Sequence, residues 1–342
     1  MYTIPPKKLV TINILNILKK YSDENHRLTQ QRISELLKSE YLMDVDRKTV
    51  KRNLMNLLDI DDKICYTEDV RKGRNGEDIT VYSDWYYYHD FDNSEIRLLI
   101  DSLFFSKHIP YSQCKQLAQK LSGLSNVYFG NRIKHIRSLP ENQPENKELF
   151  YTIDILDEAI DKNKKVLFTY NSFGTDKKLH PRKTEKYLVN PYQMAAANGR
   201  YYLIGNVDKY NDIAHFRIDR ITAIELTDES RKPLKNVKGT EHGLTLPKHM
   251  AEHIYMFSGE SVRVEMQAEK YIVSDLIDWF GKDIRFKNES ENHVTAVVTV
   301  NETAIRKWAL QYALHVRIIA PQELADNIKQ DLREAMKNYE IL

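Results

Sequence analysis

The sequence predicts an α+β protein built from several domains. Its 342 residues are too many for one compact core and predict about two to four domains. Apolar residues recur at helical spacing in the N-terminal part of the chain and at strand spacing between residues 166 and 226. Strand and helix patterns then alternate from residue 262 onward. We therefore expect helical and sheet-forming regions to follow one another as separate domains.

Composition and charge exclude several classes of protein. The 51 Lys and Arg against 49 Asp and Glu give a net charge of +2, so any surface that binds a polyanion must be a local patch. No apolar run approaches the roughly 18 residues of a membrane span, and the N-terminal stretch lacks the continuous apolar core of a signal peptide. Cys65 and Cys114 fit no metal-ligand spacing. We expect a cytoplasmic protein with reduced cysteines, no membrane partner, no metal and no other cofactor.

Three helical patterns occupy residues 7–58. Thr29 is a suitable N-cap for the second helix and Asp46 for the third, which ends near Leu58. The first helix has an apolar stripe at Leu9, Ile12, Leu15 and Leu18. The second is expected to bury Ile33, Leu36 and Leu37, and the third Val50, Leu54 and Leu57.

The third helix carries a basic face opposite its apolar face. Residues 47 and 51, and residues 48 and 52, are like-charge pairs at i,i+4 that repel each other on an isolated helix. Such a pattern is tolerated where something negative lies opposite. The residues predicted to contact DNA from this helix are Arg47, Lys48, Thr49, Lys51, Arg52 and Asn53.

A β-hairpin is predicted after these helices. Residues 63–68 and 79–86 alternate like two strands, and the tip between them contains glycines. The tip also contains Arg71, Lys72 and Arg74. Three helices followed by a hairpin is the order of a winged helix-turn-helix, whose third helix enters the major groove and whose wing reaches the DNA backbone. Residues 1–90 are therefore predicted to bind double-stranded DNA.

The region that follows is predicted to be a helical connector, over residues 91–148. Its first helical stripe is Ile96, Leu99 and Leu103. The polar, proline-containing stretch 140–147 is a natural boundary. A helix at 151–162 then leads into a strand at 166–170.

Three further strands are predicted within residues 186–221, at 187–189, 201–207 and 213–218, with an Ala-Asn-Gly-Arg turn between the first two. The last strand places Arg217 among apolar neighbours, and Arg220 lies just beyond it. A buried guanidinium needs an acceptor or an anionic ligand, because leaving it unpaired is costly. From these strands alone, an antiparallel sheet with two salt-bridged arginines remains an open alternative.

This segment resembles the signature of the WYL domain, the sensory module of many bacterial transcription regulators. The resemblance rests on Pro191-Tyr192, on residues 199–203 and on residues 216–221. Tyr201 stands where the family has the Trp of its Trp-Tyr-Leu motif, and Tyr187 stands where members often carry a basic residue. The third helix, DRKTVKRNLMNLL, also resembles the recognition helix that precedes WYL domains.

The resemblance implies a small Sm-like β-barrel over residues 149–228 that senses a ligand. It also implies that Arg217 and Arg220 serve one basic surface, although alternation along a regular strand would point them to opposite faces. We therefore predict that the strand ends or bulges near Asp219. Arg217, Arg220 and Tyr202 should then lie near one concave surface, with Tyr170 as a neighbour. The implied ligand is anionic: a nucleotide, an oligonucleotide or another phosphorylated or carboxylated metabolite.

The C-terminal region follows a linker at 229–258. Residues 259–342 give the order β-α-β-β-α-β with one added helix that starts at Pro321. This order predicts a ferredoxin-like unit, and it resembles the C-terminal extension that commonly follows WYL domains.

Two motifs carry little weight. The run His249-Met250-Ala251-Glu252-His253 matches the H-x-x-E-H zinc-protease pattern, but five residues match by chance often. A connector helix packed through Ile254, Met256 and Phe257 is the preferred interpretation. The aromatic run 85–88 can stack bases, but more often such a run is the seam between a wing and the next helix. No Walker loop, Rossmann glycine pattern or nucleophile elbow is present in the sequence, so we expect no enzyme activity.

These patterns together predict a homodimeric, bacterial-type transcription regulator. An anionic effector bound to its WYL domain is expected to alter its binding to a DNA operator. The alternative is an interaction module whose WYL barrel binds single-stranded nucleic acid or regulates a partner enzyme. The operator, the effector and the choice between repression and activation are left open.

Overall fold

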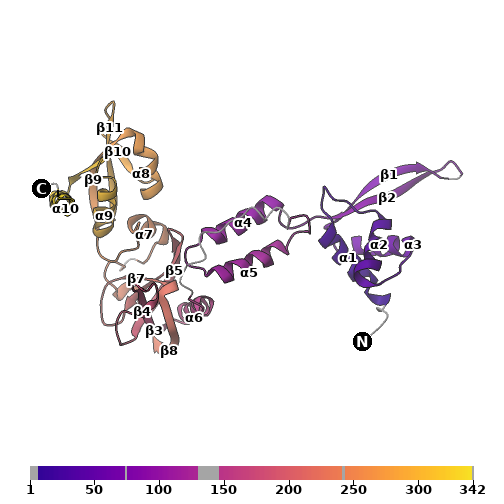
Figure 1. Ribbon diagram of the computed structural model, residues 1–342, viewed down its shortest axis with the longest axis horizontal. Coiled ribbons are helices and arrows are strands. Elements are labelled where there is room, and N and C mark those ends of the chain that lie inside the picture. Colours follow the sequence, from indigo (N-terminus) through magenta and orange to yellow (C-terminus); the bar gives the residue numbers. More distant parts are fainter. Residues whose placement is uncertain (1–6, 74, 130–145, 241–242, 341–342) are drawn as a thin grey trace. The chain divides into compact units, whose positions relative to one another are not determined.

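The computed structural model describes residues 7–73, 75–129, 146–240 and 243–340. The chain divides into two compact units, Met1–Ser106 with Tyr111–Gln143, and Lys107–Pro110 with Pro144–Leu342 (Figure 1). Most of the boundary predicted at 140–147 lies outside the described residues. Across the described part of the chain, no helix has both the length and the apolar character that a membrane span requires.

The first unit begins with a 3-10 turn, Lys7–Leu9, and three α-helices. These are α1 (Val10–Tyr21), α2 (Gln30–Tyr41) and α3 (Arg47–Leu58). Thr29 Oγ1 accepts a hydrogen bond from the backbone N–H of Arg32 at 3.1 Å, and Asp46 Oδ1 accepts one from Thr49 at 3.0 Å. Both predicted N-caps are thus confirmed, and they fix where α2 and α3 start.

The buried face of α1 differs from the predicted stripe. Leu9 is 43% and Ile12 is 54% exposed, whereas Ile14 and Ile17 are buried in the core of this unit. The predicted stripe was therefore wrong at its first two positions. The error arose because α1 is apolar around much of its circumference, and spacing alone does not choose between two overlapping stripes.

A two-stranded antiparallel hairpin follows, formed by β1 (Ile64–Lys72) and β2 (Asp78–Tyr87). Trp85 is fully buried against the three helices, while Tyr88 is exposed. The aromatic run 85–88 is therefore largely a packing seam, as preferred from the sequence. Two helices, α4 (Asn93–Phe105) and α5 (Tyr111–Ser122), come next and pack through Ile96 and Ile100, whereas the predicted core residue Leu99 is 40% exposed.

The second unit contains a strongly bent antiparallel sheet covered by α6 (Leu149–Asp161). Its strands are β3 (Lys164–Phe173), β4 (Leu179–Pro181), β5 (Tyr187–Ala197), β6 (Arg200–Val207), β7 (Ala214–Arg217) and β8 (Ile221–Ser230). The order is β4-β3-β5-β6-β7, and β8 pairs with the other side of β3. No pairing joins β7 to β8 among the described strands, so the sheet forms a half-barrel where a barrel was predicted.

Two local features shape the half-barrel. Asn198 and Gly199 both have positive φ, 52° and 70°, which confirms the predicted tight turn between β5 and β6. The pairing register of β5 with β6 shifts between Pro191 and Gln193. A proline is tolerated within a sheet at such an irregularity, because it has no N–H to donate there.

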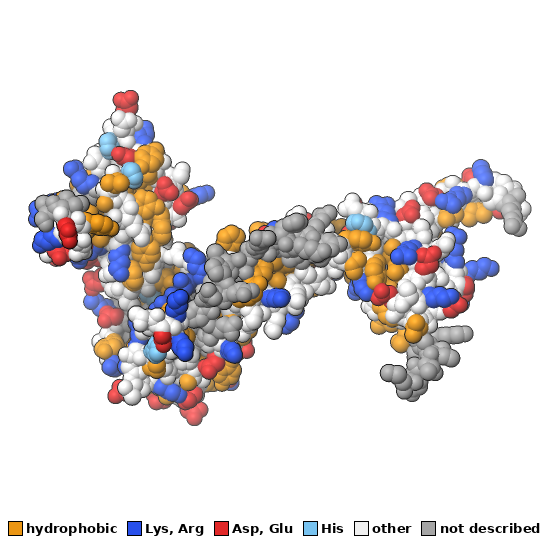
Figure 2. Space-filling model, in the orientation of Figure 1, with side chains coloured by type: hydrophobic (Ala, Val, Ile, Leu, Met, Phe, Trp, Pro, Cys, Tyr) orange, Lys and Arg blue, Asp and Glu red, His pale blue; other side chains and the backbone are white. Residues whose placement is uncertain are grey.

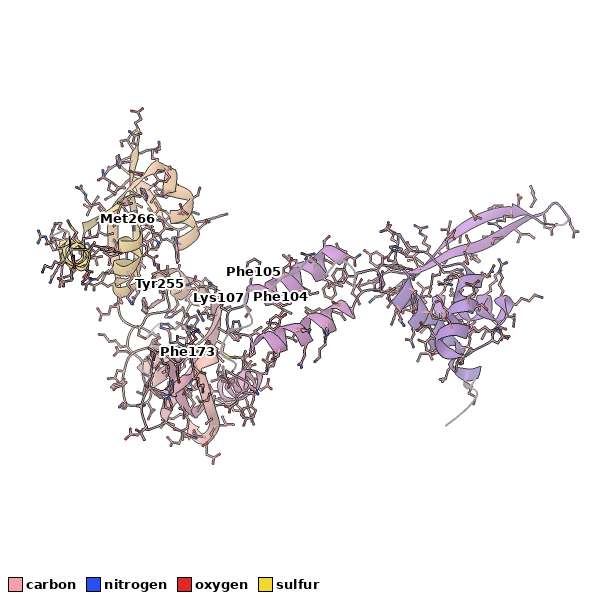
Figure 3. All side chains as sticks on the ribbon, viewed as in Figure 1. Phe104, Phe105, Lys107, Phe173, Tyr255 and Met266 are labelled. Atoms are coloured by element: carbon pink, nitrogen blue, oxygen red, sulfur yellow. The ribbon has the colours of Figure 1, made fainter. Side chains whose placement is uncertain are left out.

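The C-terminal part is a second sheet with helices on one face, reached through a linker that includes η5 (Leu234–Asn236) and α7 (Leu246–Glu252). It contains β9 (Ser261–Glu269), η6 (Lys270–Ile272), α8 (Val273–Phe280), β10 (Arg285–Lys287), β11 (His293–Asn301), α9 (Glu302–Gln311), β12 (Val316–Ala320) and α10 (Gln322–Asn338). The antiparallel order is β10-β11-β9-β12. The predicted β-α-β-β-α-β succession is confirmed. Its core contains Trp308 and Met266, the latter labelled in Figure 3.

Candidate functional site

The basic face of α3 is exposed. Lys48, Lys51 and Arg52 are all exposed, and within the described residues none of them forms an ion pair. Arg47 is held from the neighbouring helix, because its Nε donates to Oε1 of Gln30 at 3.1 Å. Figure 2 shows Lys and Arg side chains projecting from this unit. Four cations on one helix face, with three of them unpaired, create a local positive potential that the net charge of the chain conceals.

Two predicted contact residues on α3 are engaged within the protein. The Thr49 hydroxyl donates to Asp46 Oδ2 at 2.8 Å, which reinforces the N-cap. The Asn53 amide donates to the backbone carbonyl of Thr49 at 2.8 Å, and its oxygen accepts from the hydroxyl of Thr11 on α1. These contacts orient α3 within its unit.

The basic residues of the hairpin are paired with nearby carboxylates. Lys72 lies 2.7 Å from Asp78, and Arg71 lies 3.4 Å from Asp69. All four side chains are well exposed, so each pair contributes little to stability and a phosphate can displace the carboxylate. Arg74, the third predicted contact, lies outside the described residues.

In the second unit, Arg217 ends strand β7 and is held from two directions. Its Nε and Nη2 contact the two carboxylate oxygens of Asp219 at 3.0 and 2.5 Å. Its backbone N–H donates to the Tyr170 hydroxyl at 3.1 Å. Because Tyr202 is its cross-strand partner on β6, the two side chains share one face of the sheet.

The predicted interruption after Arg217 is confirmed. The 3-10 turn η4 (Ile218–Arg220) separates β7 from β8 and breaks the alternation of side chains. The guanidinium carbon of Arg220 lies 5.5 Å from the ring centre of Phe173, labelled in Figure 3. Arg220 Nε is buried and has no hydrogen-bond partner among the described residues. An unsatisfied donor on a cation is costly, which favours an acceptor at this position.

Arg200, at the start of β6, joins the same cluster. Burial and the positive charge of Arg217 lower the pKa of Arg200, and Arg220 adds to this effect. Burial raises the pKa of Tyr202, and the charges of Arg217 and Arg200 oppose that rise. Three guanidinium groups therefore lie within electrostatic reach of one another, and the carboxylate of Asp219 partly compensates their charge. We call Arg200, Tyr202, Arg217 and Arg220 the arginine cluster.

His108, from the short segment of the second unit before α5, borders this cluster. Its Nδ1 lies 3.3 Å from the carbonyl of Gly199, and burial lowers its pKa, although Asp219 opposes this. The arrangement is suited to an anion, because guanidinium groups bind phosphate and carboxylate oxygens in two-point geometry. The aromatic rings of Tyr170, Tyr202 and Phe173 add flat apolar contact beside these charges.

Comparison with protein families identifies two domains. A family model of the WYL domain matches residues 151–226, which contain the half-barrel and the arginine cluster. A family model of the WCX domain matches residues 259–336, the second sheet with its helices. The chain therefore contains a WYL domain followed by a WCX domain.

Two solved structures have similarity over 99% of the chain. One is the proteasome accessory factor B/C (PafBC) of Arthrobacter aurescens, with 15% identity, 50% of that chain covered and a TM-score of 0.29. The other is a CRISPR Cas-related protein, with 14% identity, 88% of that chain covered and a TM-score of 0.38. The protein thus spans about half the length of PafBC, and at these TM-scores neither likeness carries an argument. No curated protein matches the sequence.

Within the WYL domain, the structure brings together the four residues named from the sequence: Tyr170, Tyr202, Arg217 and Arg220. It adds Arg200 and, from the Lys107–Pro110 segment outside this domain, His108, both of which sequence reasoning missed. Arg200 lies within the WYL-like segment 199–203, and its position two residues before Tyr202, on the same face of a strand, was the available signal. His108 lies 91 residues from Gly199 in sequence, and no local pattern marks it.

Proposed function

We propose that this WYL-domain protein is a transcription regulator that binds duplex DNA through its first unit. The exposed, carboxylate-free basic face of α3 is the observation that carries this proposal. Three helices followed by a hairpin give the element order of a winged helix-turn-helix, in which the third helix lies in the major groove. Lys51 and Arg52 would contact DNA from α3, with Lys48 and Arg47 beside them.

The hairpin has a secondary role in this proposal. Arg71 and Lys72 would exchange their carboxylate partners for DNA phosphates, a contact that positions the protein without reading sequence. Two protomers would present two copies of α3 to a pseudo-palindromic operator, since twofold protein symmetry is matched by repeated half-sites.

We further propose that the arginine cluster of the WYL domain binds an anionic effector without any enzyme activity. The unsatisfied Nε of Arg220 and the crowding of three guanidinium groups support an anion at this place. An effector coupling of about 1–3 kcal/mol would change the affinity for the operator by roughly 5- to 150-fold.

A genomic binding experiment tests the proposal. The purified protein is mixed with fragmented genomic DNA from its source, and the retained fragments are sequenced. The proposal predicts enrichment of a small set of fragments that share an inverted repeat. Uniform retention of all fragments, or none, would reject sequence-specific regulation by the intact chain.

A further inference from the structure

Three histidines meet where the linker helix α7 contacts the half-barrel. His215 comes from β7, while His249 and His253 come from α7 and the residue after it. The Nε2 atoms of His215 and His249 lie 2.7 Å apart. The ring centres of His249 and His253 are 4.1 Å apart and nearly parallel, and the ring of His215 lies 5.0 and 5.2 Å from theirs. We call these residues the histidine cluster.

The histidine cluster belongs to a larger contact between the linker and the WYL domain. Apolar linker residues cover the face of β5 and β6 that includes Tyr202. The Asn198 amide of the β5–β6 turn also donates to the carbonyl of Ile254 at 2.6 Å. The apolar linker side chains in this contact are Leu244, Leu246, Met250 and Met256. His215 and Arg217 alternate with Phe216 along β7, so the histidine cluster and the arginine cluster share one sheet face.

The hydrogen bond between His215 and His249 requires both of these rings to be neutral, whereas Nδ1 of His253 donates to the backbone carbonyl of His249 at 3.0 Å. Nδ1 of His215 is buried without a partner among the described residues, so it is best assigned as a bare acceptor and Nε2 as the donor to His249. Protonating His215 would place a buried N–H where no acceptor lies. Protonating His249 would set two N–H donors against each other across 2.7 Å. Either proton opposes the contact.

Neighbouring charges do not offset such a proton. On α7, Lys248 and Glu252 pair with each other at 3.9 Å. On β7, Arg217 is paired with Asp219, and β6 contributes Arg200 and the phenol of Tyr202. Burial, with His249 and His253, lowers the pKa of His215 to about 3. Burial and His253 lower the pKa of His249 to about 4.

The cluster is not arranged as a metal site. Two imidazole ligands of one tetrahedral zinc ion lie about 3.3 Å apart, given Zn–N bonds of about 2.0–2.1 Å. The observed 2.7 Å is that of a hydrogen bond. Over the described ranges, no group of three His, Cys, Asp or Glu side chains is placed to hold a metal ion. The H-x-x-E-H motif therefore has a different use here.

We propose that the histidine cluster is a proton-sensitive latch that holds the linker against the WYL domain. When His215 and His249 are neutral, the latch is closed and Tyr202 is covered. When either of them is protonated, α7 separates from β7 and the apolar face around Tyr202 becomes accessible. The proposal stands independently of DNA binding and of any effector.

The lowered pKa values of His215 and His249 set the direction of the pH dependence. The docked rings resist protonation, so docking is fully favoured above the ordinary histidine pKa of about 6.5 and weakens as pH falls below it. Each pH unit below that value disfavours docking about tenfold for one histidine. At pH 5.0 the docking equilibrium should fall by about 30-fold for one histidine and up to about 1000-fold for two.

Hydrogen exchange of the full-length protein tests the latch. Exchange of residues 246–256 is measured by mass spectrometry at pH 7.5 and 5.0 and corrected for intrinsic rates. We expect protection of this segment to fall at least 30-fold at pH 5.0, with less than threefold change in β9 and β11. The double variant His215→Gln/His249→Gln should lose this pH response. The control His180→Gln, at an exposed histidine of the same domain, should keep it.

A charged variant tests the latch even if α7 does not dock on β7 in the glutamine variant. His249→Lys places a permanent charge in the latch, and it should expose residues 246–256 at pH 7.5 as acid exposes the wild type. Unchanged protection in the wild type at pH 5.0 would overturn the proposal. So would a pH response retained in the glutamine variant, a closed linker in His249→Lys, or equal loss of protection throughout β5, β6, β9 and β11.

Discussion

Arg217 and Asp219 form a two-point ion pair in which both side chains are more than four-fifths buried. Asp219 thereby occupies the guanidinium edge that an anionic ligand would use. A bound phosphate would have to displace this carboxylate or bind beside it, through Arg200 and Arg220. The pair thus compensates the charge of the buried Arg217 in the ligand-free protein. Displacing Asp219 costs free energy, which lowers the affinity for an anion that binds Arg217.

Replacing Asp219 with Asn should strengthen anion binding. The variant frees the Arg217 guanidinium, and a charge-assisted hydrogen bond contributes about 1.5–3 kcal/mol, so affinity for pyrophosphate should rise about tenfold or more. Isothermal titration calorimetry measures this, with the exposed Asp212→Asn as control. Lower or equal affinity in Asp219→Asn would mean that Arg217 does not contact the anion.

Removing either arginine should have the opposite effect. Arg217→Ala and Arg220→Ala each delete a guanidinium from the arginine cluster. An anionic molecule that co-purifies with the wild type should therefore be absent from both variants. Native mass spectrometry of the purified proteins detects this. Duplex binding without effector should stay within threefold of wild type, because α3 belongs to the other unit. Retention of the same molecule by both variants would place the ligand elsewhere.

Charge reversal on α3 should weaken DNA binding without unfolding the unit. Lys51→Glu and Arg52→Glu change exposed side chains that form no ion pair in the described structure. We expect roughly 5- to 150-fold weaker duplex binding for each, since base contacts contribute about 1–3 kcal/mol. Fluorescence anisotropy gives the affinity and thermal unfolding the stability. Lys115→Glu, at an exposed lysine of α5, is the matched control and should bind as the wild type does. Unaltered binding by both α3 variants would remove this helix from the interface.

The hairpin should contribute affinity but little specificity. Replacing Arg71 and Lys72 with Ala removes two phosphate contacts, so the slope of log affinity against log salt should flatten by up to about two units. Operator and random duplexes should weaken alike, because phosphates carry no sequence information. Titrations at four salt concentrations measure both effects. A loss confined to the operator would show that the hairpin reads bases.

The sequence was most informative where local chemistry decides the structure. Thr29 and Asp46 cap their helices as predicted, and Asn198-Gly199 forms the expected turn, because each depends on neighbours within a few residues. The break after Arg217 was inferred from the conflict between strand alternation and a shared basic surface. That inference held, since η4 interrupts β7 where the conflict required it.

Local sequence patterns did not predict contacts between residues far apart in the sequence. The contact of His108 with Gly199 and the meeting of His215 with His249 join residues 91 and 34 positions apart. No local period records either pairing. The use of Asn53 in a contact with Thr11 was missed for the same reason, because the α1–α3 packing that creates it is tertiary.

The comparison of three nucleic acids tests the central claim most directly. Affinities of the full-length protein are measured for a duplex from the upstream region of its own gene, for a random duplex of equal length and for the matching single strand, at one salt concentration. Specific recognition predicts binding to the upstream duplex at least 1000-fold tighter than to random duplex, and weaker binding again to the single strand. Equal affinity for both duplexes, or a preference for the single strand, would contradict the account and favour a WYL domain that binds single-stranded nucleic acid.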